Sequence, residues 1–364
     1  MILAWKAALI IFAGLISLEI SAAEAAEKTV FPAPGGQQTI LSVHGATDLA
    51  AMEPLIRDFQ GLSPTVTVEY NEYLTNDLFN RAASECDAKQ GTMDLVLSSS
   101  ADHLVKLVND GCALNYRSVM THRLPSWTRW RDEVFGFTFE PAVIVYNRDL
   151  VPPEDVRRTR AELIDLLRTK PEQYNGKIGS FDISQSGVGY LFASYDAHGT
   201  TTFGRLLEAF GRAGLVASCC TTDLVSDLAS GRLAIGYNLI GSYAVGAARR
   251  GAHLAIVIPR DYTVVLSRAV FIPRFSRNPV SAFRFLDYLL SERGQKKSRE
   301  ASFFFSFEGT LPEEVDGPLW LASSGGDSGR SFSMSSRICP PSYETVTVWP
   351  HQMMWAHRSP LELP

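Results

Sequence analysis

Short apolar runs alternate with amphipathic segments along the first third of the chain. The runs at 39–44, 66–70 and 93–97 are rich in β-branched and aliphatic residues, which is typical of buried strands. Each run is followed by a polar turn and then by apolar residues at helical spacing. Pro54 interrupts the first helical pattern, so the regular helix is expected to begin near it. Strand, turn and helix in repetition predict βα units on a mostly parallel sheet.

The same alternation returns between residues 159 and 258. Thr159 and Glu162 have the spacing of a capping box at the start of a helix. Strands are predicted at 176–182, 233–237 and 254–258, and helices after Ser184–Gly189, at 203–210 and after Ser218–Asp223. A final helix is expected to start at Asn278–Pro279 and to end at 291–295. This region is therefore a second α/β block.

Two long apolar segments bracket this second block. Phe137–Asn147 and Tyr262–Pro273 are rich in aromatic and β-branched residues and are predicted to be strands. The chain is then expected to cross from one lobe to another and to return. Lobe 1 would comprise residues 38–140 and 262–310, and lobe 2 residues 141–261. A cleft between two lobes is where a small ligand would bind.

The two ends of the chain differ in character from the rest. Residues 1–25 contain one positive charge, an apolar run and small residues, which predict a cleaved signal peptide and a periplasmic location, with an uncleaved anchor as the alternative. Residues 27–37 are expected to be a disordered leader. The segment 323–364 is rich in Ser, Gly, Pro, His, Trp and Met without periodicity, which predicts a disordered tail. We hypothesise that a shifted or truncated reading frame replaced native helices there.

Composition narrows the choice of partners. With 364 residues, of which 46% are hydrophobic and 20% charged, the chain is long enough for two globular cores. The formal charge of −5 argues against nucleic acid or an anionic membrane as a partner, although it leaves room for a local positive pocket. We therefore expect a soluble monomer that binds a small molecule.

The five cysteines show neither metal-ligand spacing nor a CxxC motif, so no metal site is predicted. A disulfide between Cys86 and Cys112 would be compatible with an oxidising compartment. Cys219 and Cys220 are adjacent, and a bond between them would require an unusual geometry. The favoured interpretation is that the cysteines are unpaired thiols.

Polar residues cluster where predicted strands give way to helices. In a parallel sheet these turns share one edge, where backbone N–H groups and helix dipoles attract anions. Each turn alone is typical of a helix N-cap, but together the turns could line a polar cleft. Arg268 is the candidate charge partner, with a salt bridge at the sheet edge as the alternative, and Glu140 is interpreted as a solvated hinge carboxylate. The predicted ligand-binding residues are Thr47, Ser99, Ser100, Ser184, Ser186, Gly187, Thr221, Tyr237, Asn238, Ser242 and Arg268.

Signals for catalysis are weak. The sequence contains no GxGxxG, P-loop, HExxH or GxSxG motif. Gly326–Gly329 reads Gly-Asp-Ser-Gly, which resembles the nucleophile turn of trypsin-like proteases, but no matching histidine element accompanies it. We therefore predict no catalytic residue and no cofactor, and the chain is expected not to be an enzyme.

Several segments, in this order, resemble the extracellular solute-binding proteins of ABC importers, specifically the iron(III)-type branch. The resemblance extends from about Gln38 to Phe307 and implies a type II periplasmic-binding fold with two lobes and two crossing hinge strands. The chain is also similar to periplasmic phosphoglycerate-sensing proteins that partner a histidine kinase. The segments that carry the resemblance are 42–48, 93–100, 145–147, 174–179, 231–238 and 285–295.

The resemblance also bears on the ligand. Iron-binding members use two adjacent tyrosines where this chain has Tyr237-Asn238, so a hard anionic ligand for iron is missing. Other members bind phosphorylated sugars or organic acids through Ser, Thr and helix N-termini. The predicted function is delivery of a small anionic ligand, a phosphorylated or carboxylated compound or a ferric iron complex, to an ABC permease. A ligand-sensing subunit of a two-component system and, more distantly, a secreted hydrolase are the alternatives.

Overall fold

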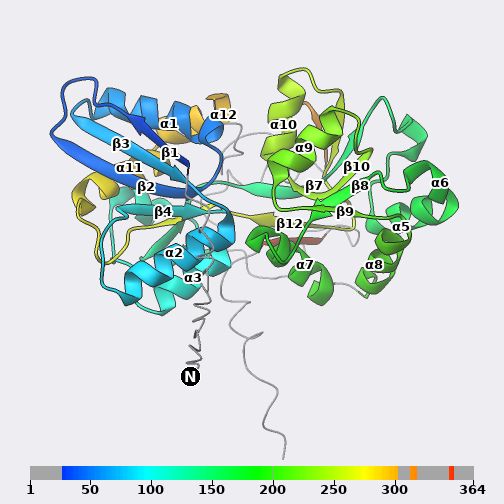
Figure 1. The fold of residues 1–364 in the computed structure, drawn as a ribbon, viewed down its shortest axis with the longest axis horizontal. Coiled ribbons are helices and arrows are strands. Elements are labelled where there is room, and N and C mark those ends of the chain that lie inside the picture. Colours follow the sequence, from blue (N-terminus) through cyan, green and yellow to red (C-terminus); the bar gives the residue numbers. More distant parts are fainter. Residues whose placement is uncertain (1–26, 200, 302–311, 318–343, 348–364) are drawn as a thin grey trace, which may run out of the picture.

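The computed structural model describes residues 27–199, 201–301, 312–317 and 344–347 of the chain. These residues form two α/β lobes that lie side by side, with a sheet in each (Figure 1). The predicted signal peptide lies outside the described residues, and so does most of the predicted tail. The predicted fold class, two lobes of mixed α/β structure, is confirmed.

The sheet of lobe 1 has the order β1-β3-β2-β4-β13-β6-β5. The strands β2, β3 and β4 are parallel, as the βα repetition predicts, and the others join them antiparallel. The strands are β1 (Glu27–Phe31), β2 (Thr39–Ala46), β3 (Val66–Glu72), β4 (Leu95–Ser98), β5 (Arg129–Trp130), β6 (Val134–Gly136) and β13 (Ala269–Phe271).

Helices pack on both faces of this sheet. On one face, Phe59 and Phe285 meet edge to face inside a core that the strand residues Leu41, Val43 and Val68 complete. A separate cluster around Leu104 and Phe271 fills the other face. The helices are α1 (Leu49–Leu62), α2 (Thr75–Asp87), α3 (Ala101–Asn109), α4 (Val119–Arg123), η1 (Ser126–Thr128), α11 (Pro279–Leu290) and α12 (Glu292–Ala301).

The sheet of lobe 2 has the order β14-β11-β7-β10-β8-β9, and β12 pairs with the start of β7. The strands β8, β9 and β10 are parallel, whereas β7 runs against its neighbours. The strands are β7 (Glu140–Asn147), β8 (Ile178–Phe181), β9 (Val216–Ser218), β10 (Ile235–Ile240), β11 (Leu254–Val257), β12 (Tyr262–Leu266), β14 (Val315–Asp316) and β15 (Glu344–Thr347), of which β15 pairs with β12.

Buried aliphatic side chains cover both faces of this second sheet. The predicted capping box is present, because Thr159 accepts a hydrogen bond from the Glu162 N–H and the Glu162 carboxylate accepts one from the Thr159 N–H. The helices are η2 (Pro153–Asp155), α5 (Arg160–Thr169), α6 (Pro171–Tyr174), α7 (Gly187–Gly199), α8 (Phe203–Arg212), α9 (Thr221–Ala229) and α10 (Gly241–Arg249).

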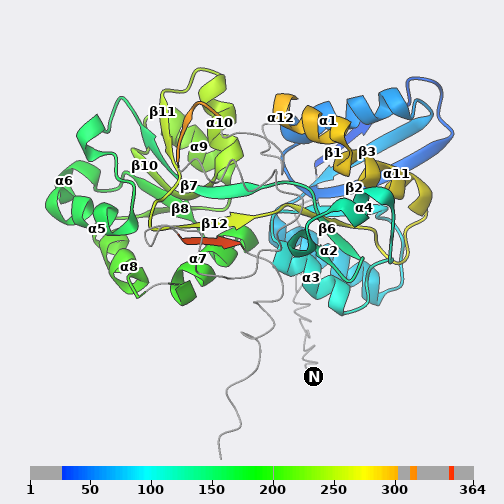
Figure 2. The same ribbon diagram turned by 180° about the vertical axis from the view of Figure 1, so that it is seen from behind.

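Two crossings connect the lobes, as Figure 2 shows from behind. The chain leaves β6 for β7 through residues 137–139 and returns from β12 to β13 through Ser267 and Arg268. The crossings lie against each other, since the Phe137 N–H donates to the Arg268 carbonyl at 2.9 Å and the Arg268 N–H to the Thr138 hydroxyl at 2.9 Å. The predicted strand 262–273 is therefore divided at the hinge into β12 and β13, and the predicted strand 137–147 forms β7 only from Glu140 onwards.

Three local predictions are wrong. Residues 27–31 form β1 and pair with β3 instead of belonging to a disordered leader, because Phe31 is buried in the core of lobe 1. Helix α1 begins at Leu49 with Pro54 inside it, since burial of Met52, Ile56 and their neighbours outweighs one missing hydrogen bond. Within the segment 323–364, expected to be disordered, residues 344–347 form β15.

The interpretation of the cysteines as unpaired thiols is wrong for both pairs in the described residues. Cys86 and Cys112 form a disulfide that links α2 to the chain after α3. Cys219 and Cys220 are also bonded to each other, with their Cα atoms 3.7 Å apart. The turn between β9 and α9 accommodates this geometry. The fifth cysteine, Cys339, lies outside the described residues.

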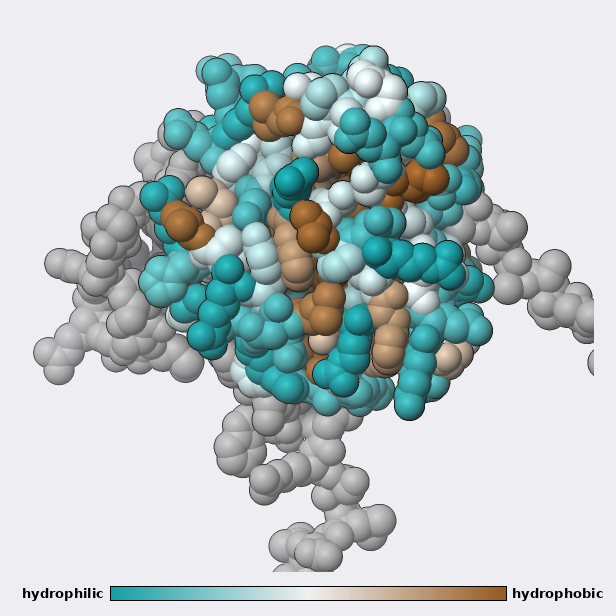
Figure 3. Space-filling view, turned by 90° about the vertical axis from the view of Figure 1, so that its left-hand side faces the viewer, coloured by the Kyte–Doolittle hydropathy of each residue, from teal (hydrophilic) through white to brown (hydrophobic). Residues whose placement is uncertain are grey.

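One face of the molecule is mostly hydrophilic (Figure 3). On the face of the molecule seen in Figure 3, hydrophilic residues predominate and apolar ones occur singly or in small groups. Scattered apolar residues of this kind are normal for a globular surface. Within the described part of the chain, none of the helices combines the length and the apolar character needed to cross a bilayer.

A buried ionic cluster stabilises the interior of lobe 2. The Arg160 side chain has no exposed surface, and its Nε donates to the Tyr237 hydroxyl at 2.7 Å. Its Nη1 donates to Asp261 at 3.0 Å, and its Nη2 lies 3.5 Å from the Asp196 carboxylate, which is also buried. Asp196 additionally accepts hydrogen bonds from Tyr237 and Asn238. The cluster joins α5, α7, β10 and the start of β12.

Removing the cation of this cluster should be costly. Arg160→Met leaves the Asp196 carboxylate buried without its charge partner, so we expect a loss of about 3–5 kcal/mol in the free energy of unfolding, measured in urea. Arg168→Met is the matched control, since it breaks only a surface pair with Glu208 and should cost about 0–1 kcal/mol. Equal losses in the two variants would contradict the role assigned to the cluster.

A buried histidine lies in lobe 1, beside the cleft. The His44 ring is 6% exposed, and its nitrogens lie 3.0 Å from the Ser42 and Tyr73 hydroxyls. Burial lowers the pKa of His44 to about 4 from its ordinary value of 6.5, although the Glu85 carboxylate acts in the opposite direction. The imidazole is therefore neutral at pH 7, and the structure holds it through hydroxyl groups.

This low pKa makes stability depend on pH. Because the unfolded chain binds a proton at His44 below pH 6.5 and the folded chain does not, stability falls as the pH drops from 6.5 towards 4. His44 should account for about 1.5 kcal/mol of the loss between pH 6.5 and 5. Denaturant unfolding at the two pH values should show a smaller loss for His44→Gln, whereas His122→Gln, at an exposed position, should keep the wild-type loss. An unchanged loss in His44→Gln would contradict this account.

Candidate functional site

A cavity of about 90 Å³ lies between the lobes, at the carboxyl ends of the parallel strands of both sheets. The turns after β2, β3 and β4 contribute from lobe 1, and those after β8, β9 and β10 from lobe 2. Helices begin at these turns, so N-terminal helix ends surround the cavity. This is the edge of a parallel sheet at which ligands bind in open α/β folds.

Polar groups predominate on the lobe 1 side. Thr47 and Asp48 follow β2, Glu72 ends β3, and Ser99 follows β4. The Glu72 carboxylate accepts a hydrogen bond from the Leu49 N–H at 2.8 Å, so it occupies the N-terminus of α1. Burial raises the pKa of Glu72 from its ordinary value, while the bond from the Leu49 N–H opposes this. The N-terminus of α1 therefore already has an acceptor in Glu72 and is less available to the anionic group of a ligand.

Lobe 2 contributes a wall with more apolar surface. Phe181 and Ile240 end their strands, and Val188 lies in the first turn of α7. The bonded pair Cys219–Cys220 and the hydroxyl-bearing Thr221 and Thr222 complete the wall. The first hydrogen bond of α9 runs from the Leu224 N–H to the Cys220 carbonyl, so the N–H groups of residues 221–223 precede it at the helix end.

Arg268 lies at the base of the cavity, in the crossing from β12 to β13. Its side chain is buried, with Nε donating to the Glu140 carboxylate at 3.0 Å and Nη1 to the Thr47 hydroxyl at 2.8 Å. The guanidinium carbon lies 5.3 Å from the centre of the Tyr243 ring. The Arg268 side chain thus contacts Glu140 at the other crossing, Thr47 in lobe 1 and Tyr243 at the start of α10.

The ion pair is a coupled, desolvated unit. Burial raises the pKa of Glu140, and the charge of Arg268 works against that rise. Burial likewise acts to lower the pKa of Arg268, but Tyr243 and Glu140 outweigh it and the pKa is raised, so the guanidinium is charged. Glu140 does not line the cavity. Arg268 is therefore among the residues that line the cavity, whereas its carboxylate partner is not.

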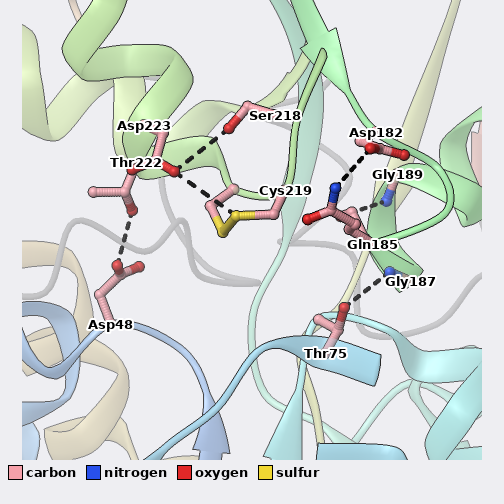
Figure 4. Close-up of a disulfide and its surroundings, with 12 residues drawn as sticks. Asp48, Thr75, Asp182, Gln185, Gly187, Gly189, Ser218, Cys219, Thr222 and Asp223 are labelled. Carbon is pink, nitrogen blue, oxygen red and sulfur yellow. Dashed lines mark hydrogen bonds between the residues drawn. A yellow bond between two sulfur atoms is a disulfide. The ribbon is translucent and has the colours of Figure 1, made fainter. Parts of the chain in front are cut away.

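Direct hydrogen bonds also join the two lobes around the cavity. The Thr222 hydroxyl donates to Asp48 at 2.8 Å, and the Gly187 N–H donates to the Thr75 hydroxyl at 2.8 Å (Figure 4). The approach at α7 is close, since a Cβ on Gly187 would come within 2.6 Å of the Ser100 hydroxyl oxygen. In this structure the two lobes are therefore in direct contact.

Five of the predicted ligand-binding residues line the cavity. Thr47, Ser99, Ser186, Thr221 and Arg268 come from strand ends or the hinge of both lobes and lie together as the βα repetition predicts. For Arg268, both interpretations apply in part, because the residue lines the cavity and also forms a salt bridge. Glu140, interpreted as solvated, is instead buried, because the pairing of the crossings encloses it.

Tyr237 and Asn238 do not line the cavity. Strand β10 continues to Ile240 past an irregularity between Gly236 and Leu239, where Asn238 has a φ of 55°. The strand end that faces the cleft therefore lies later in the sequence than predicted. Tyr237 and Asn238 point into lobe 2, where both contact Asp196.

The remaining predicted residues lie next to the cavity but do not line it. The Ser100 side chain and Gly187 are buried against each other at the lobe contact. Ser184 bonds to Asp182 through both its N–H and its hydroxyl, as an exposed turn residue. Ser242 is buried at the start of α10.

Several cavity residues were outside the predicted set. Among them, Asp48 and Thr222 could have been included from their neighbours Thr47 and Thr221, because they belong to the same turns. Glu72 ends β3, and Tyr73 and Thr75 follow it in a polar turn that was not singled out. The further lining residues are Ala46, Leu74, Phe181, Gln185, Val188, Cys219, Cys220, Ile240 and Tyr243.

Comparisons with known proteins agree with this architecture. Residues 54–309 match the family described as bacterial extracellular solute-binding protein. The crystal structure of the substrate binding protein of the ABC transporter from Agrobacterium tumefaciens is 35% identical, with a TM-score of 0.75, over 81% of this chain and 86% of that chain. None of the curated proteins matches this chain.

Two more distant structures share the fold. Iron-bound HitA from Pseudomonas aeruginosa has a TM-score of 0.61 at 16% identity, over 74% of this chain and 86% of that chain. The periplasmic binding protein AfuA from Actinobacillus pleuropneumoniae, with exogenous fructose-6-phosphate bound, has a TM-score of 0.65 at 16% identity, over 77% of this chain and 89% of that chain. The family match covers more than half of the chain, so this chain belongs to the bacterial extracellular solute-binding protein family.

Proposed function

We propose that this protein captures a small organic anion, phosphorylated or carboxylated, in the periplasm and delivers it to the permease of an ABC importer. The observation that carries the proposal is the buried Arg268 guanidinium at the base of the interlobe cavity. A desolvated cation that lines a cavity forms strong charge-assisted hydrogen bonds with carboxylate or phosphate oxygens.

The N-terminus of α9 supports the same choice of ligand. Thr221 and Thr222 line the cavity and contribute hydroxyl groups next to the N–H groups at the helix end. The positive end of the helix dipole favours a negative charge there. A ligand anion would be shared between Arg268 in the hinge and α9 in lobe 2.

The acidic side chains of the cavity are compatible with an anionic ligand, because each carboxylate already accepts a hydrogen bond from a protein donor. Glu72 accepts from the Leu49 N–H, and Asp48 accepts from the Thr222 hydroxyl. Asp48 also accepts from the Tyr243 hydroxyl. These carboxylates are therefore engaged in fixing α1 and in joining the lobes, and the hydroxyl groups of a ligand would be suitable additional donors to them.

A ferric ion is less well suited to this cavity. Tyr237, at the place of the iron ligands in the resembling family branch, bonds to Arg160 and Asp196 inside lobe 2. Tyr243 lines the cavity, but burial raises the pKa of its phenol, which opposes the phenolate form that binds iron. The Arg268 charge beside it would repel a trivalent cation.

Import fits the family and the lobe contacts. The relative from Agrobacterium tumefaciens is the substrate binding protein of an ABC transporter, and AfuA has fructose-6-phosphate bound. A ligand held between Arg268 and α9 would favour the arrangement in which the lobes touch, which a permease can recognise. The sensor alternative stays a prediction, since no specific observation favours it.

A ligand screen tests this function. The mature protein should be stabilised by roughly 2–4 kcal/mol when a phosphorylated sugar, a phosphoglycerate or citrate is present far above its dissociation constant, because the ligand binds only the folded state. Thermal melting with each compound, and with ferric citrate, measures the effect. A ferric charge-transfer colour that is lost in Tyr243→Phe, with no response to the iron-free anions, would contradict the proposal.

The role of Arg268 can be tested separately. Arg268→Gln combined with Glu140→Gln replaces both charges without leaving one buried alone, and we expect the dissociation constant of the best anion to rise about 10- to 100-fold. Isothermal titration gives the constants. Arg249→Gln is the control, because Arg249 pairs with Glu314 outside the cavity, and it should bind as wild type.

Two outcomes would count against Arg268 as the anion partner. One is unchanged affinity in a folded double variant, shown by a wild-type circular dichroism spectrum. The other is an equal loss of affinity in Arg249→Gln. Arg268→Lys separates charge from geometry, since it keeps the charge but loses the bidentate fork, and it should fall between wild type and the double variant.

A further inference from the structure

The disulfide between Cys219 and Cys220 lines the interlobe cavity, and nothing in the proposed function uses it. Figure 4 shows it between the Thr222–Asp48 hydrogen bond on one side and Gln185 with Gly187 on the other. Both cysteines are half-buried. A disulfide at this position presents two sulfur atoms, without N–H or O–H donors, towards the space that a ligand would occupy.

We propose that this disulfide is a ligand-contacting surface, against which the non-polar face of an organic anion packs. The inference deepens the proposed function and rests on it. Sulfur is polarisable and weakly hydrated, so it favours contact with C–H groups over contact with water. The ligand would then have two different sides, an anionic group and a non-polar ring or chain face.

The rest of the cavity has the same two-sided character. Phe181, Val188 and Ile240 lie with the disulfide in the lobe 2 part of the lining. Arg268 and Thr47, which bond to each other at 2.8 Å, lie at the base and on the lobe 1 side. A sugar phosphate or a similar organic anion matches both sides, whereas inorganic phosphate or a metal ion matches only the polar one.

The disulfide lies in a turn that is held by other contacts. Cys220 is the N-cap residue of α9, and Thr222 in the first turn donates to Asp48 across the cleft. Asp223 accepts from the Ser218 hydroxyl at 3.4 Å, which holds the turn before the disulfide. The non-polar surface is therefore presented from a turn that also carries the lobe contact.

Reduction would open the bonded pair and add two weak S–H donors to this surface. A dithiol reductant transfers two electrons and two protons, so the S–S bond breaks, both cysteines become thiols, and the reductant becomes its own disulfide. Two S–H groups then replace the single bonded unit and no longer constrain each other. The organic part of the ligand should lose affinity, and its anionic part should not.

Two probes separate these effects. Glucose 6-phosphate carries both an anionic group and a ring, and inorganic phosphate carries only the anionic group. Isothermal titration compares wild type with Cys219→Ser/Cys220→Ser, in which hydroxyls replace the sulfurs. We expect the dissociation constant of glucose 6-phosphate to rise about tenfold and that of inorganic phosphate to change less than about twofold.

The control variant removes the other disulfide. Cys86→Ser/Cys112→Ser lies away from the cavity, and it should leave the ratio of the two dissociation constants unchanged. In this background, with Cys339→Ser added, Cys219 and Cys220 are the remaining cysteines. A dithiol reductant should reproduce the loss for glucose 6-phosphate, and reoxidation should restore binding.

The outcomes distinguish this inference from the proposed function. An equal loss for both probes, or no loss for either, overturns the disulfide surface while anion binding stands. If neither anion binds but neutral glucose binds in a disulfide-dependent way, the surface is supported and the anionic ligand is overturned. If no organic probe, charged or neutral, responds to the state of Cys219 and Cys220, the inference is wrong.

Discussion

The ion pair between Arg268 and Glu140 is the interaction on which the arrangement of this protein depends. Both side chains are buried at the hinge, where either charge alone would cost several kcal/mol. The pair links the start of β7 to the return from β12, so it fixes both crossings against each other. Because the guanidinium also bonds to Thr47, the base of the cavity is defined by the same contact that joins the lobes.

The two sheets place the remaining groups around this base. Parallel strands end at one edge, and helices that begin there direct N–H groups and hydroxyls towards the opposite lobe. In lobe 1, Glu72 accepts a hydrogen bond from the Leu49 N–H, and Asp48 accepts one from Thr222 of lobe 2. The start of α9 in lobe 2 contributes Thr221 and Thr222 to the cavity. The cavity thus combines a fixed cation with a helix end from the other lobe.

Local sequence patterns were enough to predict the βα units, the capping box at Thr159 and the turns at Thr47 and Thr221, because these depend on residues close in the chain. It could not predict that β10 continues through an irregularity at Asn238, since Gly-Tyr-Asn is locally typical of a turn. The burial of Glu140 was missed because its partner is 128 residues away. For Cys219 and Cys220, adjacency argued against a bond that the turn between β9 and α9 accommodates.

The contacts between the lobes bear on how the proposed ligand would act on this structure. Direct hydrogen bonds such as Thr222 to Asp48 and Gly187 to Thr75 each contribute about 0.5–1.5 kcal/mol, which is comparable to the free-energy difference between open and closed arrangements of a few kcal/mol. These hydrogen bonds alone therefore leave the open and closed arrangements close in free energy. Arg268 bonds to Thr47 of lobe 1 and α9 belongs to lobe 2, so the proposed ligand, in contact with Arg268 and α9, would bridge the two lobes. The proposed ligand would then supply the difference that decides the arrangement.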